Sequence, residues 1–355
     1  MRIIEKLGLL SVGILMSVSG CVSPSQTDLA RPVESSPVCE GSASGKELEP
    51  LVVSPSAGVS SLPYVLWGVQ SGCFASHGLE ISIETGTSDA FQKVASIVGG
   101  TVDIGIDGIV ELVGIASGST SELDLRLISN GYGFSTEQLE QAKTSQLLDG
   151  DLILETVLLG QPGSEWSGLS DLVGKSVAMN VSGNNAGGLR IALREAGISP
   201  KDVEFFDMGS SERAVAFERG DVDFVMLSGL EARKQLERGA TIALYPGAFI
   251  YQPGPVLAFY TTEGVLQQKK DEIVAFQKAI AELNLWLSNP ENVGVFREFM
   301  VEEFDYDPQT AEKFRIPNFT LGPPRDGLIE AYAEKLFENG LLDSPEVQGL
   351  SVFIP

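Results

Sequence analysis

The chain has 355 residues, a length that predicts two lobes or domains rather than one core. It carries 24 Lys and Arg residues against 48 Asp and Glu residues, which gives a formal net charge of −24. This charge argues against a nucleic-acid partner, because phosphate binding needs surplus positive charge. A single His leaves little room for a His-based metal site or Ser-His-Asp catalysis, and the composition favours a non-enzyme with neither metal nor cofactor.

Residues 1–20 have the features of a bacterial export signal. Arg2 and Lys6 precede an uncharged apolar run over residues 7–18, which is shorter than the roughly 20 residues that a membrane-spanning helix needs. The ending at residues 18–21 resembles a lipobox, in which Cys21 becomes the lipidated first residue of the mature protein. The alternative is an ordinary signal peptide with a chance Cys. We expect a location outside the cytoplasm, on a bacterial membrane in the periplasm or at the cell surface, with the lipid on Cys21.

Residues 21–50 have the composition of a flexible tether, being rich in Ser, Pro, Glu and Gly with few large apolar side chains. Two cysteines remain, Cys39 and Cys73. Outside the cytoplasm an even pair predicts a disulfide, which here would join the tether to the first folded unit. Closing that loop would stabilise the fold by about 3–4 kcal/mol in the loop-entropy model. The alternative is two free thiols.

From residue 51 onward short apolar runs alternate with amphipathic stretches, a pattern typical of parallel sheets covered by helices on both faces. In the first half, strands are predicted over residues 51–53, 79–84, 103–106 and 125–129, and helices over 62–71, 90–98 and 110–116. In the second half, strands are predicted over 151–159, 175–179, 203–206, 222–227, 241–244 and 255–261, and helices over 186–196, 211–219, 231–238 and 271–287. The remainder is expected to be helical and acidic. The sequence therefore predicts two similar α/β halves.

Four sequence elements occur in an order and spacing that resemble a known family. The first contains Pro63, Tyr64, Gly72, Phe74, Gly78, Leu79 and Ile81; the second contains Gly100, Val102, Asp103 and Gly105. The third contains Leu169, Asp171, Leu172, Gly174, Lys175, Val177 and Ala178; the fourth contains Gly220, Asp221, Val222 and Asp223. Over residues 51–290 the chain resembles the solute-binding proteins of ABC transporters of the nitrate/sulfonate/taurine type, a family that includes binders of thiamine-pyrimidine precursors.

The resemblance implies a type II periplasmic-binding fold, with two doubly wound α/β lobes joined by two crossings. Lobe 1 would hold residues 51–155 and the return from 255 to 355 with its C-terminal helices, and lobe 2 would hold residues 160–250. Residues 151–159 and 251–260 would carry the hinge strands. The resemblance also implies a monomer that closes around one small molecule and delivers it to an ABC permease and its ATPase.

Ligands of open α/β sheets bind at the carboxyl ends of strands, so the loops there supply the candidate ligand-binding residues. In lobe 1 the first loop offers hydroxyls and backbone N–H groups before a helix, at Ser56, Gly58, Ser60, Ser61 and Tyr64. The second offers Thr87 and Ser88, whose alternative role is helix capping. The third is Asp107-Gly108, where the carboxylate either binds a ligand amine, amidine or ring N–H or caps a helix.

In lobe 2 the strongest candidate is the turn that opens the helix predicted over residues 186–196. Ser182, Gly183, Asn184 and Asn185 lie at its positively polarised N-terminus. Ser228, after the strand at 222–227, is a weaker candidate. For Tyr64, Trp67, Tyr132, Phe134 and Tyr251 we weigh stacking on a planar ligand against burial in the lobe cores.

The charge pattern leaves the ligand open. Helix N-termini favour an anion, whereas Asp107 and the acidic surface oppose one. No Arg falls in the four main loops, which weakens a sulfonate or nitrate interpretation and leaves a nitrogen heterocycle or an amphoteric compound possible. Two other functions stay open at this point. One is a lipoprotein that senses the same ligand for a membrane receptor. The other is an enzyme resembling the thiamine-pyrimidine synthase, which the missing Cys cluster disfavours.

Overall fold

The structure is a computed structural model that describes residues 38–41, 47–55, 61–85, 89–118, 123–144, 156–181, 183–304, 308, 312, 324–325 and 327–355. Within these ranges no helix is both long enough and apolar enough to cross a membrane. The predicted signal segment, the lipidation site Cys21 and most of the predicted tether lie outside the described residues.

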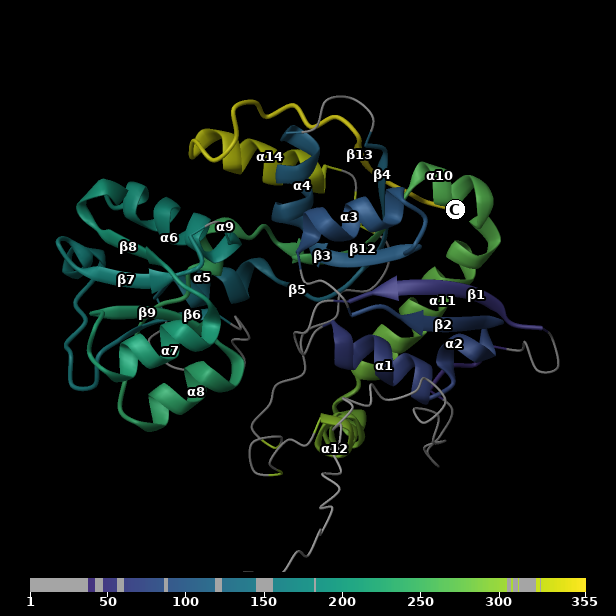
Figure 1. Cartoon of the computed structure of the whole chain (residues 1–355), viewed down its shortest axis with the longest axis horizontal. Coiled ribbons are helices and arrows are strands. Elements are labelled where there is room, and N and C mark those ends of the chain that lie inside the picture. The colour runs from purple at the N-terminus through teal and green to yellow at the C-terminus, as the bar shows by residue number, and fades with distance from the viewer. Residues whose placement is uncertain are drawn as a thin grey trace, which may run out of the picture.

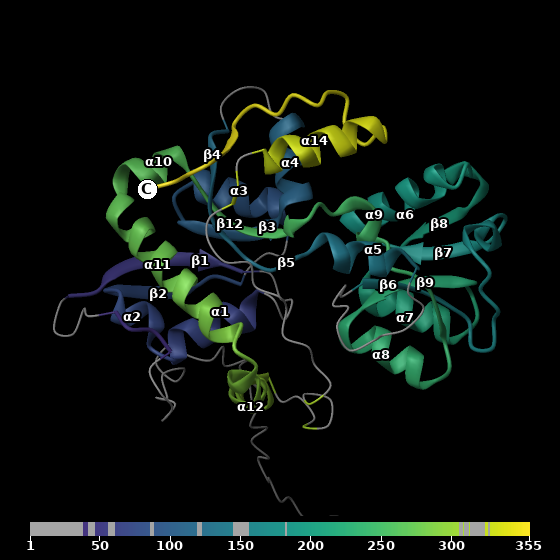
Figure 2. The ribbon, with the colours of Figure 1, turned by 180° about the vertical axis from the view of Figure 1, so that it is seen from behind.

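Two sheets form the centres of two lobes that lie side by side (Figures 1 and 2). Lobe 1, defined by the six-stranded sheet, has the strand order β13-β4-β12-β3-β1-β2. Its strands are β1 (Glu49–Ser54), β2 (Leu79–Ile83), β3 (Ile104–Gly108), β4 (Leu125–Asn130), β12 (Leu257–Thr262) and β13 (Leu350–Val352). All pairs are parallel except those of β12, which runs antiparallel to β3 and β4. The carboxyl ends of β1, β3 and β4 therefore lie at one edge of the sheet.

The helices of lobe 1 are α1 (Leu62–Gln70), α2 (Cys73–Ser76), α3 (Ala90–Val98), α4 (Ile109–Gly118), α10 (Glu263–Gln268), α11 (Lys270–Leu287), α12 (Val293–Phe304) and α14 (Leu328–Glu338). Their boundaries follow local chemistry. The Asp89 carboxylate caps α3 by accepting the Gln92 N–H at 2.8 Å, and Pro63 lies in the first turn of α1. The predicted apolar stripe of α11 is confirmed: Ile273, Phe276, Ile280, Leu283 and Leu287 are all buried.

Lobe 2, defined by the five-stranded sheet, has the strand order β10-β6-β9-β7-β8. Its strands are β6 (Thr156–Gly160), β7 (Ser176–Met179), β8 (Glu204–Asp207), β9 (Phe224–Ser228) and β10 (Thr241–Leu244). Its helices are α6 (Asn184–Glu195), α7 (Ser210–Glu218), α8 (Gly229–Glu237) and the short α9 (Gly247–Ile250), which packs on α6. Because β7 pairs parallel with both β8 and β9, helices α6, α7 and α8 all begin at the same edge of this sheet.

The two crossings between the lobes meet in a small antiparallel ribbon. It pairs β5 (Gly133–Phe134), which is followed by α5 (Thr136–Thr144), with β11 (Gly254–Pro255). A Cβ on Gly133 would lie 2.0 Å from the carbonyl oxygen of Gly254, so the ribbon needs glycine there. The predicted first hinge strand, residues 151–159, was therefore misplaced. Residues 156–160 form β6 inside the lobe 2 sheet, and 151–155 lie outside the described residues.

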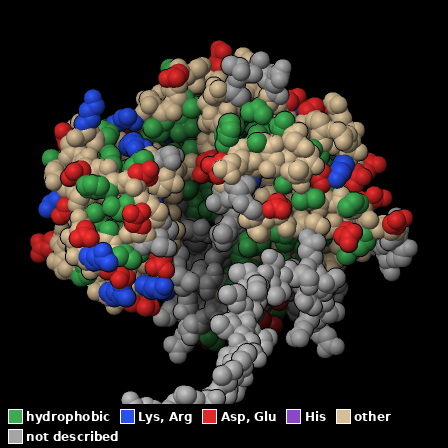
Figure 3. Space-filling model, viewed as in Figure 1, with side chains coloured by type: hydrophobic (Ala, Val, Ile, Leu, Met, Phe, Trp, Pro, Cys, Tyr) green, Lys and Arg blue, Asp and Glu red, His purple; other side chains and the backbone are tan. Residues whose placement is uncertain are grey.

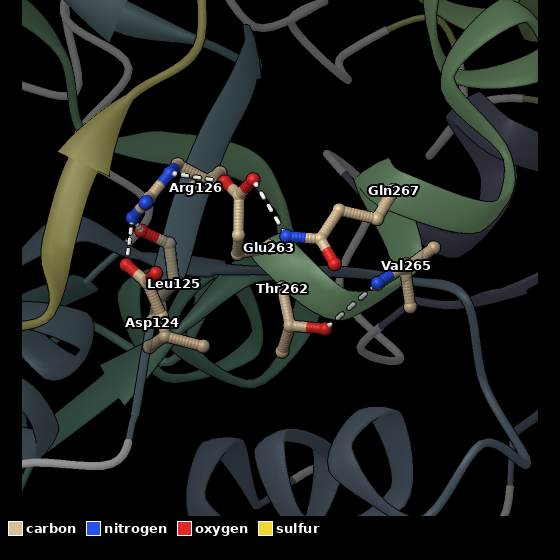
Figure 4. Close-up of polar contacts among 7 residues, drawn as sticks. All are labelled: Asp124, Leu125, Arg126, Thr262, Glu263, Val265 and Gln267. Atoms are coloured by element: carbon tan, nitrogen blue, oxygen red, sulfur yellow. Dashed lines mark hydrogen bonds and ion pairs between the residues drawn. The ribbon is translucent and has the colours of Figure 1, made fainter.

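A polar cluster joins the outer end of β12 to β4 (Figure 4). The Arg126 guanidinium on β4 donates to Glu263 at 3.1 Å and pairs with Asp124, while Gln267 donates to the same Glu263 carboxylate at 3.4 Å. The Thr262 hydroxyl accepts the Val265 N–H and so caps α10. These contacts fix the point where the chain leaves the lobe 1 sheet and turns into its C-terminal helices.

Cys39 and Cys73 form a disulfide with a Cα–Cα distance of 5.0 Å. It joins the segment at residues 38–41 to α2, and the Glu40 N–H donates to Glu282 on α11 at 2.9 Å. The only His of the chain, His77, lies 3.1 Å from the same Glu282 carboxylate. Although Cys39, His77 and Glu282 bring possible metal-ligating atoms within 4.8 Å of one another, the Cys39 sulfur is already committed to the disulfide.

Candidate functional site

Three helices of lobe 2 present their N-termini at the edge that faces lobe 1. The N-cap residues are Gly183 for α6, Gly209 for α7 and Ser228 for α8, and none of them caps its helix through a side chain. Helix α6 begins two residues earlier than predicted, so Asn184 and Asn185 lie in its first turn. Uncapped first-turn N–H groups carry partial positive charge, so this edge suits a ligand oxygen or an oxyanion.

A pocket of about 210 Å³, which we call the polar pocket, lies at this edge. Its lining includes four predicted residues, Gly183, Asn184, Asn185 and Ser228. It also includes Arg213, which projects from the first turn of α7. Arg213 is half-buried, and its Nε is buried with no hydrogen-bond partner among the described residues. Burial lowers the pKa of the Arg213 guanidinium, and the nearby Asp207 carboxylate raises it. Arg213 therefore brings a positively charged guanidinium group to the wall of the pocket.

Lobe 1 contributes Glu111 to the wall of the polar pocket. This carboxylate lies in the first turn of α4, accepts the Gly108 N–H at 3.1 Å and is hydrogen-bonded by the Asn184 side chain of lobe 2. Glu111 is accessible from the pocket, yet protein from both lobes surrounds its carboxyl. Burial and the Asp107 charge raise the pKa of Glu111. The hydrogen bonds from Gly108 and Asn184 and the charge of Lys93 lower it by less. Glu111 can thus present a carboxyl group to the ligand and to the other lobe.

Gly108 is needed for this contact between the lobes. A Cβ there would lie 2.8 Å from Asn184 Nδ2 and 2.9 Å from a Glu111 carboxylate oxygen. Any larger residue at the end of β3 would displace one of these side chains. The predicted site residue Gly108 therefore acts by its small size, while the side chains that meet above it are Glu111 and Asn184.

The predicted ligand contact of Asp107 needs correction. Asp107 is 3% exposed and both carboxylate oxygens have partners inside lobe 1: Lys93 Nζ lies 2.6 Å from Oδ1, and the Tyr260 hydroxyl donates to Oδ2 at 2.9 Å. Lys93 is itself fully buried and also donates to the Ile106 carbonyl. The carboxylate therefore neutralises a buried lysine beneath the site, and its charge raises the pKa of Glu111.

Ser61 and Tyr64, at the start of α1, are likewise buried, with 2% and 0% of their surface exposed. They line neither the polar pocket nor the larger pocket beside it. The Tyr64 hydroxyl donates to the Asn284 side chain, whose amide donates to the Asn130 carbonyl at 3.3 Å. Trp67, Tyr132 and Phe134 are buried too, in agreement with the core alternative. Tyr251 stacks on Phe134 beside the hinge ribbon. The remaining predicted site residues, Ser56, Gly58, Ser60, Thr87, Ser88 and Ser182, lie outside the described residues.

A second, larger pocket of about 770 Å³, which we call the apolar groove, adjoins the polar pocket. It runs between α3, α4 and the end of α14 on lobe 1 and α6 and α9 on lobe 2. Its apolar lining residues are Ala90, Phe91, Val110, Ile115, Val181, Ile250, Leu336, Leu341 and Leu342. Figure 3 shows hydrophobic side chains gathered in the upper part of the gap between the lobes, where α6 faces α4 and α14.

Sequence reasoning missed the two charged residues of the polar pocket, Arg213 and Glu111, because it searched only the loops. No Arg lies in the four loops, but Arg213 reaches the polar pocket from a helix, so the argument against a sulfonate or nitrate ligand no longer holds. Both residues share one signal: each lies in the first helical turn after the carboxyl end of a strand, Arg213 after β8 and Glu111 after β3. That turn projects side chains toward the same edge as the loop before it.

The comparisons with known proteins agree with this architecture. Residues 157–292 match the family model described as NMT1/THI5 like. This match confirms, for that segment, the family resemblance predicted from the sequence. No curated protein sequence matches the chain.

Similar solved structures show the fold. The alkanesulfonate-binding protein SsuA from Xanthomonas axonopodis pv. citri, bound to MOPS, is 15% identical with a TM-score of 0.64, covering 87% of this chain and 100% of that one. The aliphatic sulphonate binding protein SsuA from Escherichia coli is 16% identical (TM-score 0.63; 84% and 94% covered). The nitrate-binding protein NrtA from Synechocystis PCC 6803 is 12% identical (TM-score 0.57; 84% and 83% covered). The predicted two-lobed periplasmic-binding fold is therefore confirmed.

Proposed function

We propose that this protein is an extracytoplasmic solute-binding lipoprotein, which captures a small organic molecule between its lobes and delivers it to an ABC importer. The observation that carries the proposal is the polar pocket, in which Arg213 and three uncapped helix N-termini of lobe 2 face Glu111 of lobe 1. The similar structures support it, because two of them are sulfonate-binding proteins and the third is a nitrate-binding protein.

The pocket supports a ligand with a compact polar head. An oxyanion such as a sulfonate would lie against the Arg213 guanidinium, the Ser228 hydroxyl and the first-turn N–H groups of α6. A hydrogen-bond donor on the ligand, such as an ammonium or ring N–H, would lie toward Glu111. The pocket therefore favours an anionic or amphoteric head over a purely cationic one, which the Arg213 charge would repel.

Binding rather than catalysis fits the pocket chemistry. Among the described residues that line the polar pocket and the apolar groove there is no Cys and no His, and the chain's His77 lies beside Glu282 on lobe 1. The work of such a protein is a difference in ligand affinity between open and closed lobes. Glu111 and Asn184 are hydrogen-bonded to each other across the gap, so this contact would form or break as the lobes close or open.

In this proposal residues 1–20 are removed on export, Cys21 carries the lipid, and the rest of residues 21–50 tethers the folded part to the membrane. Lobe 1 holds the chain before the β5 crossing and after the β11 crossing, and lobe 2 holds the chain between them, including α5, which packs on α9 and β10. The mature protein works as a monomer with an ABC permease and its ATPase. Metabolic labelling with a palmitate analogue, with and without Cys21→Ala, tests the anchor.

The binding role is tested by calorimetry on the soluble part from residue 38 onward. The panel holds ethanesulfonate, taurine, nitrate and an aminopyrimidine. We expect one member of the anionic group to bind, and Arg213→Gln to weaken it about 10- to 100-fold, the range for a charge-assisted hydrogen bond. Arg219→Gln is the matched control, because Arg219 is exposed at the other end of α7. Equal effects of the two substitutions would refute the assigned role of Arg213.

A further inference from the structure

A cluster of metal-ligating side chains lies on lobe 1, outside both pockets. The disulfide between Cys39 and Cys73, the imidazole of His77 and the carboxylate of Glu282 meet where α2 packs against α11 (Figures 1 and 2). We infer that this cluster, once the disulfide is reduced, binds one zinc ion through two thiolates, one imidazole and one carboxylate. The inference goes beyond the proposed function and does not depend on which solute is captured.

The sequence brings two of these ligands together on one helical turn. Cys73 is the first residue of α2, and His77 is the C-cap residue four positions later. Residues four positions apart lie on the same face of a helix, and closely spaced Cys and His residues are typical zinc ligands. The disulfide adds Cys39 to this pair, with a Cα–Cα distance of 5.0 Å to Cys73. Glu282 supplies the fourth ligand from α11.

The distances suit a four-coordinate ion. One ligand atom each of Cys39, His77 and Glu282 lies within 4.8 Å of the other two, and the sulfur of Cys73 is bonded to that of Cys39. Bond lengths of about 2.0–2.3 Å place the ligand atoms of a tetrahedral zinc ion about 3.3–3.8 Å apart. Reduction therefore has to separate the two sulfurs, while the other ligand atoms move by about 1 Å, a shift that side-chain rotation supplies.

The two ligands that are not sulfur are well placed for a cation. His77 Nε2 is buried and lies 3.1 Å from a Glu282 oxygen, yet it makes no hydrogen bond among the described residues. The Glu40 N–H donates to Glu282 at 2.9 Å, the kind of contact that orients a carboxylate ligand. The side chains of His77 and Glu282 are 12% and 36% exposed, so an ion has a path from solvent to the buried sulfurs.

The disulfide and the zinc site exclude each other chemically. A dithiol, such as dithiothreitol or the Cys-x-x-Cys pair of a thioredoxin-like protein, breaks the S–S bond by giving two electrons and two protons to the sulfurs, and itself becomes a disulfide. Zinc then displaces the two thiol protons as two Zn–S bonds form. Residues 38–41 remain attached to α2 in both states. Zinc would thus take over from the disulfide in holding the end of the tether on lobe 1.

The test uses residues 21–355 with Cys21→Ser, so that Cys39 and Cys73 are the only cysteines. One sample is kept oxidised. The other is reduced with dithiothreitol, freed of it under nitrogen, and shown to have both thiols free. Each is titrated with Co²⁺, whose tetrahedral thiolate complexes absorb strongly, and then with Zn²⁺ against a chromophoric chelator. We expect one ion per reduced chain and at least about 100-fold weaker binding by the oxidised chain, because loss of a contact that only orients a ligand already costs about 10–100-fold.

Three variants test the two ligands that are not sulfur. His77→Gln and Glu282→Gln each remove one ligand, so each should weaken zinc binding by the reduced chain at least about 10-fold. Glu272→Gln is the matched control, because Glu272 is also partly exposed on α11 but lies about 15 Å along the helix from Glu282. Cooperative thermal unfolding of the oxidised form shows that each variant is folded.

The outcomes are distinguishable. Cobalt–thiolate absorption that only the reduced chain develops, with zinc affinity weakened in His77→Gln and Glu282→Gln but not in Glu272→Gln, supports the four-ligand site. A reduced chain that unfolds cooperatively and binds no ion overturns it. Equal binding by the oxidised and reduced chains, or unchanged zinc affinity in either His77→Gln or Glu282→Gln, overturns it as well.

Discussion

The buried pair beneath the site, Lys93 and Asp107, makes lobe 1 sensitive to a single substitution. Lys93 is fully buried and Asp107 is 3% exposed, with Nζ and Oδ1 2.6 Å apart. Lys93→Met keeps the length and apolar character of the side chain but leaves the carboxylate buried without its counter-charge. Removing one partner of a buried ion pair typically costs about 3–5 kcal/mol. Because Tyr260 still donates to Asp107, we expect the lower end of that range, about 3 kcal/mol.

The assay is urea unfolding at 25 °C, followed by far-UV circular dichroism. Lys175→Met in lobe 2 is the matched control, because its Nζ lies 3.3 Å from Asp223 but both side chains are at least 41% exposed. An exposed pair of this kind contributes about 1 kcal/mol or less. A loss for Lys93→Met no larger than that for Lys175→Met would refute the reasoning.

A double substitution separates loss of charge pairing from loss of packing. In Lys93→Met with Asp107→Asn the buried charge is gone, while the amide oxygen can still accept the Tyr260 hydrogen bond. We expect this variant to recover at least half of the stability lost in Lys93→Met. If the double variant is less stable than the single one, the cost arises from the volume around α3 and β3 and not from an unpaired carboxylate.

Three other predictions concern the site, the hinge and the tether. The raised pKa of Glu111 means that folding disfavours the charged form of this carboxyl group. The stability that Glu111 contributes to the fold therefore falls as the pH rises above about 4.5. Glu111→Gln should remove this pH dependence of the unfolding temperature between pH 4 and 8. Gly133→Ala should lower stability by about 1–3 kcal/mol in urea unfolding, since its Cβ would meet the Gly254 carbonyl, and an unchanged midpoint would contradict this close approach. Cys39→Ser with Cys73→Ser should cost about 3–4 kcal/mol by the same assay, whereas a loss below 1 kcal/mol would show that the loop is held by other contacts.

Elements with a strong local signal were predictable from the sequence. Helix α3 spans Ala90–Val98, as predicted, because Asp89 is a capping residue and the apolar residues of the helix recur at helical spacing. The hinge was misplaced for the opposite reason. Strands β5 and β11 have two residues each and no periodicity, so only the pairing of segments far apart in the sequence defines them. The apolar run that suggested a hinge strand is instead the buried strand β6.

The sequence predicted which backbone segments form the candidate site better than it predicted the side-chain contacts there. The N-terminus of α6 follows from a glycine-containing turn after a strand, and the structure places Gly183, Asn184 and Asn185 in the polar pocket. The partner of Asp107 could not be found this way, because Lys93 lies 14 residues earlier in a helix and lysine is normally exposed. Its burial depends on the packing of α3 against β3, which no local pattern encodes.

The position of the two pocket charges gives the site a direction. Arg213 belongs to lobe 2 and Glu111 to lobe 1, so a guanidinium and a carboxyl group lie on opposite sides of the gap between the lobes. A head with an oxyanion at one end and a donor at the other gains from both charges only in one orientation, and only when the lobes are together. In the proposed function, ligand orientation and lobe closure are therefore coupled, because residues at the starts of α4, α6 and α7 take part in both.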